Sequence, residues 1–374
     1  MEKIIIKEAN TPKLLKDYVK FPFLLYKNHP YWIPPLISDE LETLDKTKNP
    51  AFDTAEAYFY LAYQNDKIVG RISAIINWDE VNNQKKRKVR FGWWDVIDDI
   101  AVSKALLEKV YELGKKHNLE FAEGPIGFSN LDKVGVLTEG FNRMGNMITW
   151  YNFPYYKDHL EQLGFSIEKE YQESRFTFTG IKPEQFLRAE KMIKERYGLR
   201  AVNFSNTKDI IPYVDKMFDL FNQTYAKLAS FVAVTERQRE YFKKKYIPFV
   251  NPEYIKFVED KNGKLIAFSI VMPGFSEALK KANGKLFPFG FYHLLKARKQ
   301  SKEVLFYLIG IEEEYQNKGV TSIIFSEYYK VFTEKGIETC IRTPELKENH
   351  AIHNLWKNFN SVVDRRRRTY RKDL

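Results

Sequence analysis

The chain has 374 residues, too many for one ordinary domain and enough for two. Apolar residues make up 44% of it and aromatic residues 16%, which excludes the disordered, collagen-like and coiled-coil classes. The 60 lysines and arginines exceed the 49 aspartates and glutamates by 11, and this surplus favours an anionic partner such as phosphate, nucleic acid or an anionic membrane surface. A merely solvated basic surface explains the same surplus.

The cysteine count and the apolar runs bear on where the protein works. Cys340 is the only cysteine, so no disulfide can form within the chain, as is usual in a reducing compartment. The longest apolar run, residues 304–311, has eight residues, whereas a membrane-spanning helix needs about 20. The first residues also lack the apolar core of a signal peptide. We therefore expect a cytoplasmic protein, with a peripheral place at the inner face of the membrane still open.

The predicted elements follow one order twice along the chain. Each half has an aromatic strand, a turn leading into a second strand, a third strand, an amphipathic helix and a last strand. In the first half these are residues 57–63, 65–73, 89–99, 101–117 and 119–125. In the second half they are residues 254–258, 261–269, 304–311, 320–335 and 337–344. The repetition predicts a tandem duplication with a boundary near Gly180.

The second half carries an insertion that the first half lacks. The distance from the turn lysine to the helix start is 34 positions in the first half, Lys67 to Ala101, and 56 in the second, Lys264 to Val320. The extra residues, about 275–302, hold seven basic side chains against one acid, interleaved with phenylalanine, tyrosine and leucine. Such a composition is typical of a helix lying on lipid headgroups or of a lid over an amphiphilic substrate. A loop that packs its aromatic residues on its own domain has the same composition.

The strongest chemical signal is the turn between the strand at 304–311 and the helix at 320–335. A glycine turn that enters a helix directs several free backbone N–H groups, and the positive end of the helix dipole, at one point. Such a point binds phosphate without charged side chains. Gly319 would let the anion approach closely, although loop geometry alone also explains a glycine here.

The turn Gln316-Asn317-Lys318-Gly319-Val320-Thr321 resembles the Gln/Arg-x-x-Gly-x-Gly/Ala turn of the GNAT acyltransferase superfamily. Thr321 departs from the small residue usual at the last position. The resemblance implies a mixed α/β fold with two GNAT-like domains: 1–180, without a cofactor, and 181–374, with the acyl-CoA or acetyl-CoA site and the insertion at 275–302. It also implies that acyl-CoA, a co-substrate, contacts Ile309, Ile311, Gln316, Asn317, Lys318, Gly319, Val320 and Thr321. The first half has no glycine turn, and Asp98 and Asp99 would repel a pyrophosphate there.

The resemblance to GNAT enzymes also suggests catalytic candidates. An acceptor amine must lose a proton before it attacks a thioester, and a carboxylate or an ordered water usually takes that proton. The candidates after the cofactor strand and its neighbour are Glu345, Glu348 and His350, together with Glu313; Glu345 is favoured because it directly follows the neighbouring strand. Many GNAT enzymes have a tyrosine on the next helix to protonate the thiolate, and here Trp356 takes its place. No metal site is expected, because the six histidines show no metal-ligand spacing.

The whole chain is similar to bacterial double-domain GNAT proteins, a group to which bacterial ceramide synthases belong. The expected function is transfer of an acyl group from acyl-CoA to an amine, and the basic aromatic insertion favours a lipid amine such as a sphingoid base. One alternative is an acetyltransferase acting on a small metabolite, peptide or protein amine, and another is a non-catalytic CoA-binding module. No nucleic acid partner is expected; the basic run at 365–372 is interpreted as the final strand of the fold.

Overall fold

The computed structural model describes residues 3–129, 131–178, 181–228 and 231–374, so Gly180, near which the boundary is predicted, lies outside them. Contacts divide the chain into two compact units. Unit 1 comprises Met1–Gln172, Leu279–Gly290 and Asp364–Leu374, and unit 2 comprises Glu173–Ala278 and Phe291–Val363. Part of the insertion and the last strand of the chain therefore pack with unit 1.

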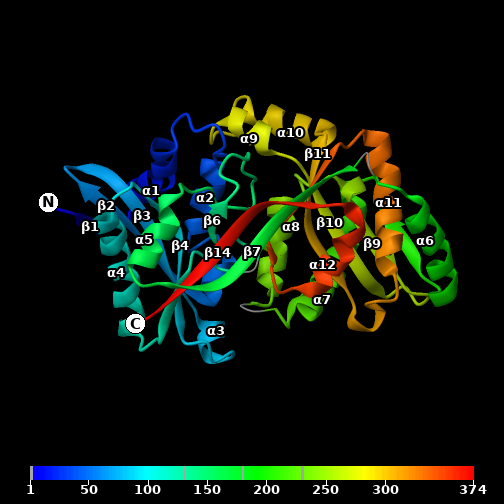
Figure 1. The fold of residues 1–374 in the computed structure, drawn as a ribbon, viewed down its shortest axis with the longest axis horizontal. Coiled ribbons are helices and arrows are strands. Elements are labelled where there is room, and N and C mark those ends of the chain that lie inside the picture. The colour runs from blue at the N-terminus through cyan, green and yellow to red at the C-terminus, as the bar shows by residue number, and fades with distance from the viewer. Residues whose placement is uncertain (1–2, 130, 179–180, 229–230) are drawn as a thin grey trace. The chain divides into compact units, whose positions relative to one another are not determined.

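Unit 1 is built on a mixed sheet in the order β1-β2-β3-β4-β5-β14, with β6 also paired to β14 (Figure 1). Its strands are β1 (Ile5–Glu8), β2 (Ala55–Gln64), β3 (Lys67–Asn77), β4 (Lys88–Val96), β5 (Phe121–Gly124), β6 (Val136–Glu139), the first part of β7 (Ser166–Thr177) and most of β14 (Val362–Asp373). Its helices are α1 (Pro12–Leu25), α2 (Ile37–Leu44), α3 (Trp78–Asn82), α4 (Ile100–Lys116) and α5 (Tyr155–Gln162). The strands and the apolar face of α4 form its main core.

Unit 2 is built on a sheet in the order β12-β11-β10-β9-β8, with the end of β7 paired to β12. Its strands are β8 (Arg200–Asn203), β9 (Ile255–Glu259), β10 (Leu265–Pro273), β11 (Glu303–Ile311), β12 (Thr339–Arg342) and β13 (Glu345–Leu346). Its helices are α6 (Glu184–Tyr197), α7 (Thr207–Tyr225), α8 (Glu236–Tyr246), α10 (Gly290–Gln300), α11 (Val320–Lys335) and α12 (His350–Trp356), while α9 (Ser276–Ala282) begins in unit 2 and ends in unit 1. The core lies between this sheet and α11, which also packs along α6 (Figure 1).

The two units repeat one order of elements, as the sequence predicts. In unit 1, β2, β3 and β4 pair antiparallel in turn, and α4 then crosses over to β5, which pairs parallel to β4. In unit 2, β9, β10 and β11 pair antiparallel, and α11 crosses over to β12, which pairs parallel to β11. A crossover helix is what allows neighbouring strands to run parallel. Helix α11 has the bounds that its apolar periodicity predicts.

The insertion at 275–302 forms two helices, α9 and α10. The basic run near the C-terminus is a strand, β14, in which Arg365 and Arg367 are buried and the intervening arginines are half-buried. Within the described ranges, no helix combines the length and the apolar character needed to cross a membrane.

Candidate functional site

The parallel strands β11 and β12 of unit 2 separate halfway along β11. They are paired from Glu303 opposite Thr339 to Phe306 opposite Arg342, and the pairing ends there. Residues 308–311 remain paired to β10 on the other side, and the register shifts at Tyr307. The change is visible in burial, because the side chains are buried up to Phe306 and half-buried at the next three positions. The second half of β11, which includes Ile309 and Ile311, therefore has one edge without a neighbouring strand.

A tyrosine from a distant part of the sequence lies at this open edge. Tyr225, the last residue of α7, donates a hydrogen bond from its hydroxyl to the carbonyl oxygen of Ile309, over 3.1 Å. Burial raises the pKa of Tyr225 to about 12, and the negative charge of Glu345 acts in the same direction. Tyr225 therefore keeps its proton at neutral pH and stands near Glu345. Tyr225 could not be predicted from the sequence, because no motif surrounds it and it is 84 positions from Ile309.

The loop after β11 ends at a helix start that no side chain caps. Asn317 and Gly319 both have a left-handed backbone, with φ of 62° and 78°. The Gln316 side chain donates back to the carbonyl oxygen of Ile311 over 3.1 Å, which holds the loop against the strand. Gly319 is the N-cap of α11 and makes no side-chain cap. The first N–H groups of α11, from Val320 and Thr321, are therefore available to an anion.

Both the packing around position 319 and its backbone conformation require a glycine there. A Cβ atom there would come within 2.5 Å of the Cδ1 atom of Ile193 on α6, and φ of 78° is strained for any other residue. Of the two explanations that the sequence allows for this glycine, close approach of an anion or loop geometry, the second is the one these contacts favour, because Ile193 fills the side-chain direction. Any role of Gly319 in binding therefore depends on its backbone.

The acidic residues of this loop are each paired with a lysine. Glu312 binds Lys264, Glu313 binds Lys227 over 2.7 Å, and Glu314 lies 3.7 Å from Lys318. The ammonium group of Lys318 also lies over the rings of Tyr197 and Tyr315. The pairs offset the negative charge that would otherwise oppose a phosphate next to the start of α11.

Glu345 is the one catalytic candidate that the structure places in a buried, structured environment. Its carboxylate binds the guanidinium group of Arg342 through two hydrogen bonds and lies 3.7 Å from Nδ1 of His353. Burial raises the pKa of Glu345, although Arg342 and His353 oppose that rise. A carboxylate whose pKa is raised is a better base near neutral pH.

The other catalytic candidates are exposed. Glu348 and His350 lie in the loop before α12 and at its first residue, and Glu313 is 73% exposed beside Lys227. The structure therefore groups Glu345 with Arg342, His353 and Tyr225, and it does not group Glu345 with Glu313, Glu348 or His350 through any contact of the described residues.

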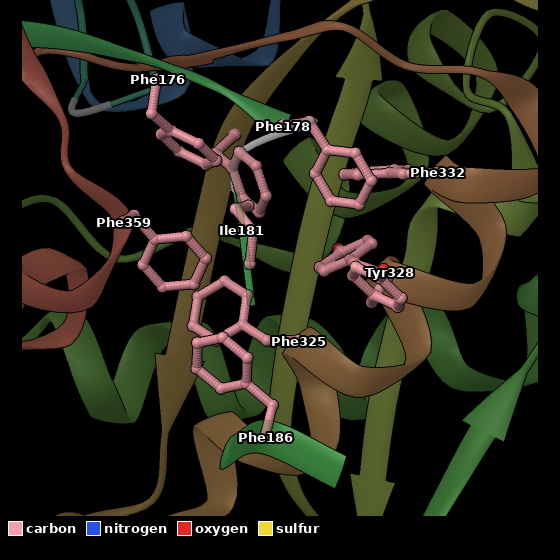
Figure 2. Close-up of a pocket in the computed structure, with 10 residues that line it drawn as sticks. Phe176, Phe178, Ile181, Phe186, Phe325, Tyr328, Phe332 and Phe359 are labelled. Carbon is pink, nitrogen blue, oxygen red and sulfur yellow. The ribbon is translucent and has the colours of Figure 1, made fainter. Parts of the chain in front are cut away.

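Trp356, which the sequence analysis places at the position of a family tyrosine, is a core residue of unit 2. It is 2% exposed and packs against Phe306 and Phe325, with ring centroids 4.9 and 5.2 Å away. The neighbouring cluster draws rings from α6, α11 and the turn after α12, and Figure 2 shows Phe186, Phe325 and Phe359 turned toward one another. The space among these rings is about 10 Å³, roughly one water molecule. This cluster is a packed core and holds no preformed acyl-chain pocket.

The corresponding helix start in unit 1 is closed by its own carboxylate. Asp99 is the N-cap of α4 and accepts a hydrogen bond from the backbone N–H of Ala101 over 2.8 Å. Asp98 lies 3.2 Å from His159. A carboxylate at this position takes the place that an anionic ligand would need. The starts of α4 and α11 therefore differ in how they are capped, and the absence of an acyl-CoA site in the first half stays a prediction.

The comparisons with known proteins concern the whole chain. No protein-family model matches it. It is 26% identical over 374 residues to Protein YghO of Escherichia coli, covering 96% of this chain and 93% of that protein. It is 26% identical over 316 residues to the bacterial ceramide synthase of Caulobacter vibrioides, covering 82% and 80%.

Solved structures resemble the chain at low sequence identity. A tandem GNAT protein from the clavulanic acid biosynthesis pathway superposes with a TM-score of 0.60 at 11% identity, covering 99% of this chain and 98% of that one. A GCN5-related N-acetyltransferase from Sphaerobacter thermophilus superposes with a TM-score of 0.52 at 9% identity, covering 99% and 95%. The α/β class and the duplication predicted from the sequence are confirmed: the chain has the fold of the tandem GNAT proteins.

Proposed function

We propose that the protein is an acyl-CoA-dependent N-acyltransferase whose acyl-CoA binds in unit 2. The observation that carries the proposal is the meeting of three features in one unit: the open edge of β11, the uncapped start of α11 and the buried Glu345. The open edge offers backbone groups to the amides of the pantetheine arm near Ile309 and Ile311. The N–H groups at the start of α11 bind the pyrophosphate.

In the proposed reaction the acceptor nitrogen attacks the thioester carbonyl carbon, so that a C–N bond forms and the C–S bond breaks. The acceptor, an ammonium ion at neutral pH, first loses one proton to Glu345, directly or through a water molecule, and Glu345 releases it to solvent. After the attack the nitrogen loses a second proton by the same route, so that a neutral amide forms as the C–S bond breaks. Tyr225 keeps its proton because its pKa is raised to about 12, so its hydroxyl, once it turns away from the carbonyl oxygen of Ile309, donates a hydrogen bond to the departing sulfur. Coenzyme A leaves as the thiolate and is protonated by solvent.

We propose a lipid amine as the acceptor. Two observations support it: the similarity to a protein named as a bacterial ceramide synthase, and the basic aromatic insertion, in which Phe287, Phe289 and Phe291 are exposed. A small metabolite, peptide or protein amine is the alternative acceptor. The described part of unit 2 offers no preformed cavity for a long acyl chain in its aromatic core, so a long-chain donor would place its chain elsewhere or open that core.

Calorimetric titration with coenzyme A, acetyl-CoA and palmitoyl-CoA tests the proposal, followed by a product assay with a sphingoid amine and with a short water-soluble amine. We expect binding of an acyl-CoA and formation of an amide. A preference for palmitoyl-CoA and the sphingoid amine supports the lipid acceptor, whereas acetyl-CoA with the short amine supports the alternative. Binding without turnover would leave a CoA-binding module, and no binding of any of the three would refute the proposal.

A further inference from the structure

The insertion presents an unusual group of exposed aromatic side chains. Phe287, Phe289, Phe291 and Tyr292 stand within six consecutive positions and are 71, 73, 43 and 62% exposed. Exposing one large apolar side chain is common, but four in one short segment form a patch that a soluble protein usually covers. These residues connect α9 to the first turn of α10. We call the segment 285–292 the aromatic segment.

The aromatic segment is flanked by basic residues on both sides. Lys281 precedes it, Lys285 is its first residue, and Lys296 and Lys299 follow it on α10, all four exposed. No acid occurs from residue 278 to residue 302, so this stretch of the chain is strongly basic. Aromatic side chains surrounded by lysines match the boundary of an anionic bilayer, where rings lie at the headgroup level and ammonium groups meet phosphates.

Contacts on both sides hold the segment in place. Before it, Gly284 accepts a hydrogen bond from the backbone N–H of Ile37 over 3.0 Å, and Lys280 donates to the carbonyl oxygen of Pro30. A side chain at Gly284 would collide with the ring of Phe23, so the two chain segments lie close together. After it, Leu294 is buried. The exposed rings are therefore presented by a segment that is fixed by its neighbours.

We propose that the aromatic segment is a membrane-docking surface that binds anionic bilayers, with Phe287 and Phe289, both in unit 1, entering the headgroup region. Charge complementarity selects an anionic lipid surface over a second copy of this chain, because a copy would bring the same lysines to the contact. The inference deepens the proposed function, on which it rests for the lipid acceptor: docking would bring the enzyme to the surface where amphiphilic amines reside.

Vesicle co-sedimentation of the full chain tests the proposal without any acyl-CoA. The vesicles contain phosphatidylglycerol mixed with phosphatidylcholine, or phosphatidylcholine alone. We expect binding to the anionic vesicles that falls with added salt, and at least tenfold weaker binding by Phe287→Ser/Phe289→Ser and by Lys281→Gln/Lys285→Gln. Met192→Ser, which alters a methionine that is 65% exposed on α6, is the control and should bind like the wild type.

Equal binding by the wild type and both double variants, or no binding of the wild type to anionic vesicles, would overturn the proposal. So would a dimer in sedimentation velocity that Phe287→Ser/Phe289→Ser dissolves, because the surface would then be an interface between copies. The outcomes remain separate from those of the proposed function. Vesicle binding without acyl transfer would refute only the proposed acyltransferase activity. Transfer to a short soluble amine without vesicle binding would refute only the proposed docking surface.

Discussion

At the scale of single residues, Glu345 has two roles that must be told apart. Its bonds to Arg342 join two side chains that are each less than a tenth exposed. Removing one partner of a buried ion pair typically costs about 3–5 kcal/mol, because the other charge stays buried without compensation. A loss of activity in a Glu345 variant therefore indicates catalysis only if the protein is still folded.

The pH dependence of turnover provides the first prediction. Because burial raises the pKa of Glu345 and a base must be deprotonated, kcat/KM should fall with decreasing pH at a higher pH than for an ordinary glutamate. Glu345→Gln should lower kcat about 100-fold or more and remove this acidic limb. Glu348→Gln, which changes an exposed glutamate, is the control and should keep both the wild-type kcat and the acidic limb. A Glu345→Gln protein that is folded by circular dichroism and retains the wild-type profile would rule out Glu345 as the base.

Tyr225 provides the second prediction. Tyr225→Phe removes one hydroxyl and its hydrogen bond to Ile309, with an expected loss of about 1 kcal/mol in the free energy of unfolding. If the hydroxyl also stabilises the departing sulfur, kcat should fall about tenfold or more while the KM for acyl-CoA changes little. A change in KM alone would show that Tyr225 only lines the binding site. Steady-state kinetics at saturating acceptor distinguish the two results.

At the scale of elements, the sequence predicted the strand and the helix on either side of the glycine turn, but not the surroundings of Glu345. The bounds of α11 follow from apolar spacing that is local in the sequence, and β11 follows from one apolar run. Tyr225 joins the site only through folding, since it comes from a helix 84 residues earlier. The pairing of Glu345 with Arg342 and His353 could not be predicted from the sequence either, because side-chain partners depend on how the loop before α12 folds back.

The starts of α11 and α4 offer a matched pair of variants for the third prediction. Thr321→Glu puts a carboxylate at the second residue of α11, where it suits the helix dipole but repels a pyrophosphate. We expect unchanged or slightly higher thermal stability and at least tenfold weaker binding of coenzyme A. Ala101→Glu adds the same charge at the second residue of α4, where Asp99 already serves as the cap.

Titration calorimetry on both variants completes this test. Ala101→Glu should bind coenzyme A like the wild type, with one site per chain. If Ala101→Glu weakened binding and Thr321→Glu did not, the acyl-CoA site would belong to unit 1. This pair is more informative than a substitution of Gly319, because any side chain there meets Ile193 and would disturb the fold itself.

Buried charge in unit 1 gives the fourth prediction, on acid stability. Burial acts to raise the pKa of Glu123, but Lys88 and Lys169, at 2.7 and 3.1 Å, outweigh it and lower the pKa to about 2. A lowered pKa stabilises the folded state above the ordinary glutamate pKa, and the gain is lost as pH falls toward 2. The free energy of unfolding of Glu123→Gln should therefore be about 3 kcal/mol lower than that of the wild type at pH 7. Urea titrations should show that this difference between the two proteins is smaller at pH 3. A gap that is independent of pH would contradict this account.

At the scale of the whole molecule, residues from both ends of the chain belong to the same unit. Residues 364–374 belong to unit 1, where β14 pairs with β5 from Tyr370 opposite Gly124 to Asp373 opposite Phe121. Tyr370 is fully buried in the core of that unit. Arg367 donates to the carbonyl oxygen of Trp150 over 2.6 Å. The duplicated order of elements does not predict that the last strand joins unit 1, because local patterns predict a strand at the C-terminus but not which sheet it joins.

The fifth prediction follows from this placement of β14. A chain that ends at Val363 lacks one strand of unit 1 and should lose the cooperative unfolding of that unit, although the deletion is at the far end of the sequence. Five of the six tryptophans, Trp32, Trp78, Trp93, Trp94 and Trp150, lie in unit 1, so tryptophan fluorescence reports mainly on it. We expect a red-shifted emission without denaturant in the shortened chain. Removing only Leu374 leaves β14 complete and should preserve the wild-type spectrum. A shortened chain with native emission and an unchanged urea midpoint would show that unit 1 folds without its last strand, and the N-terminal half would then be an autonomous domain.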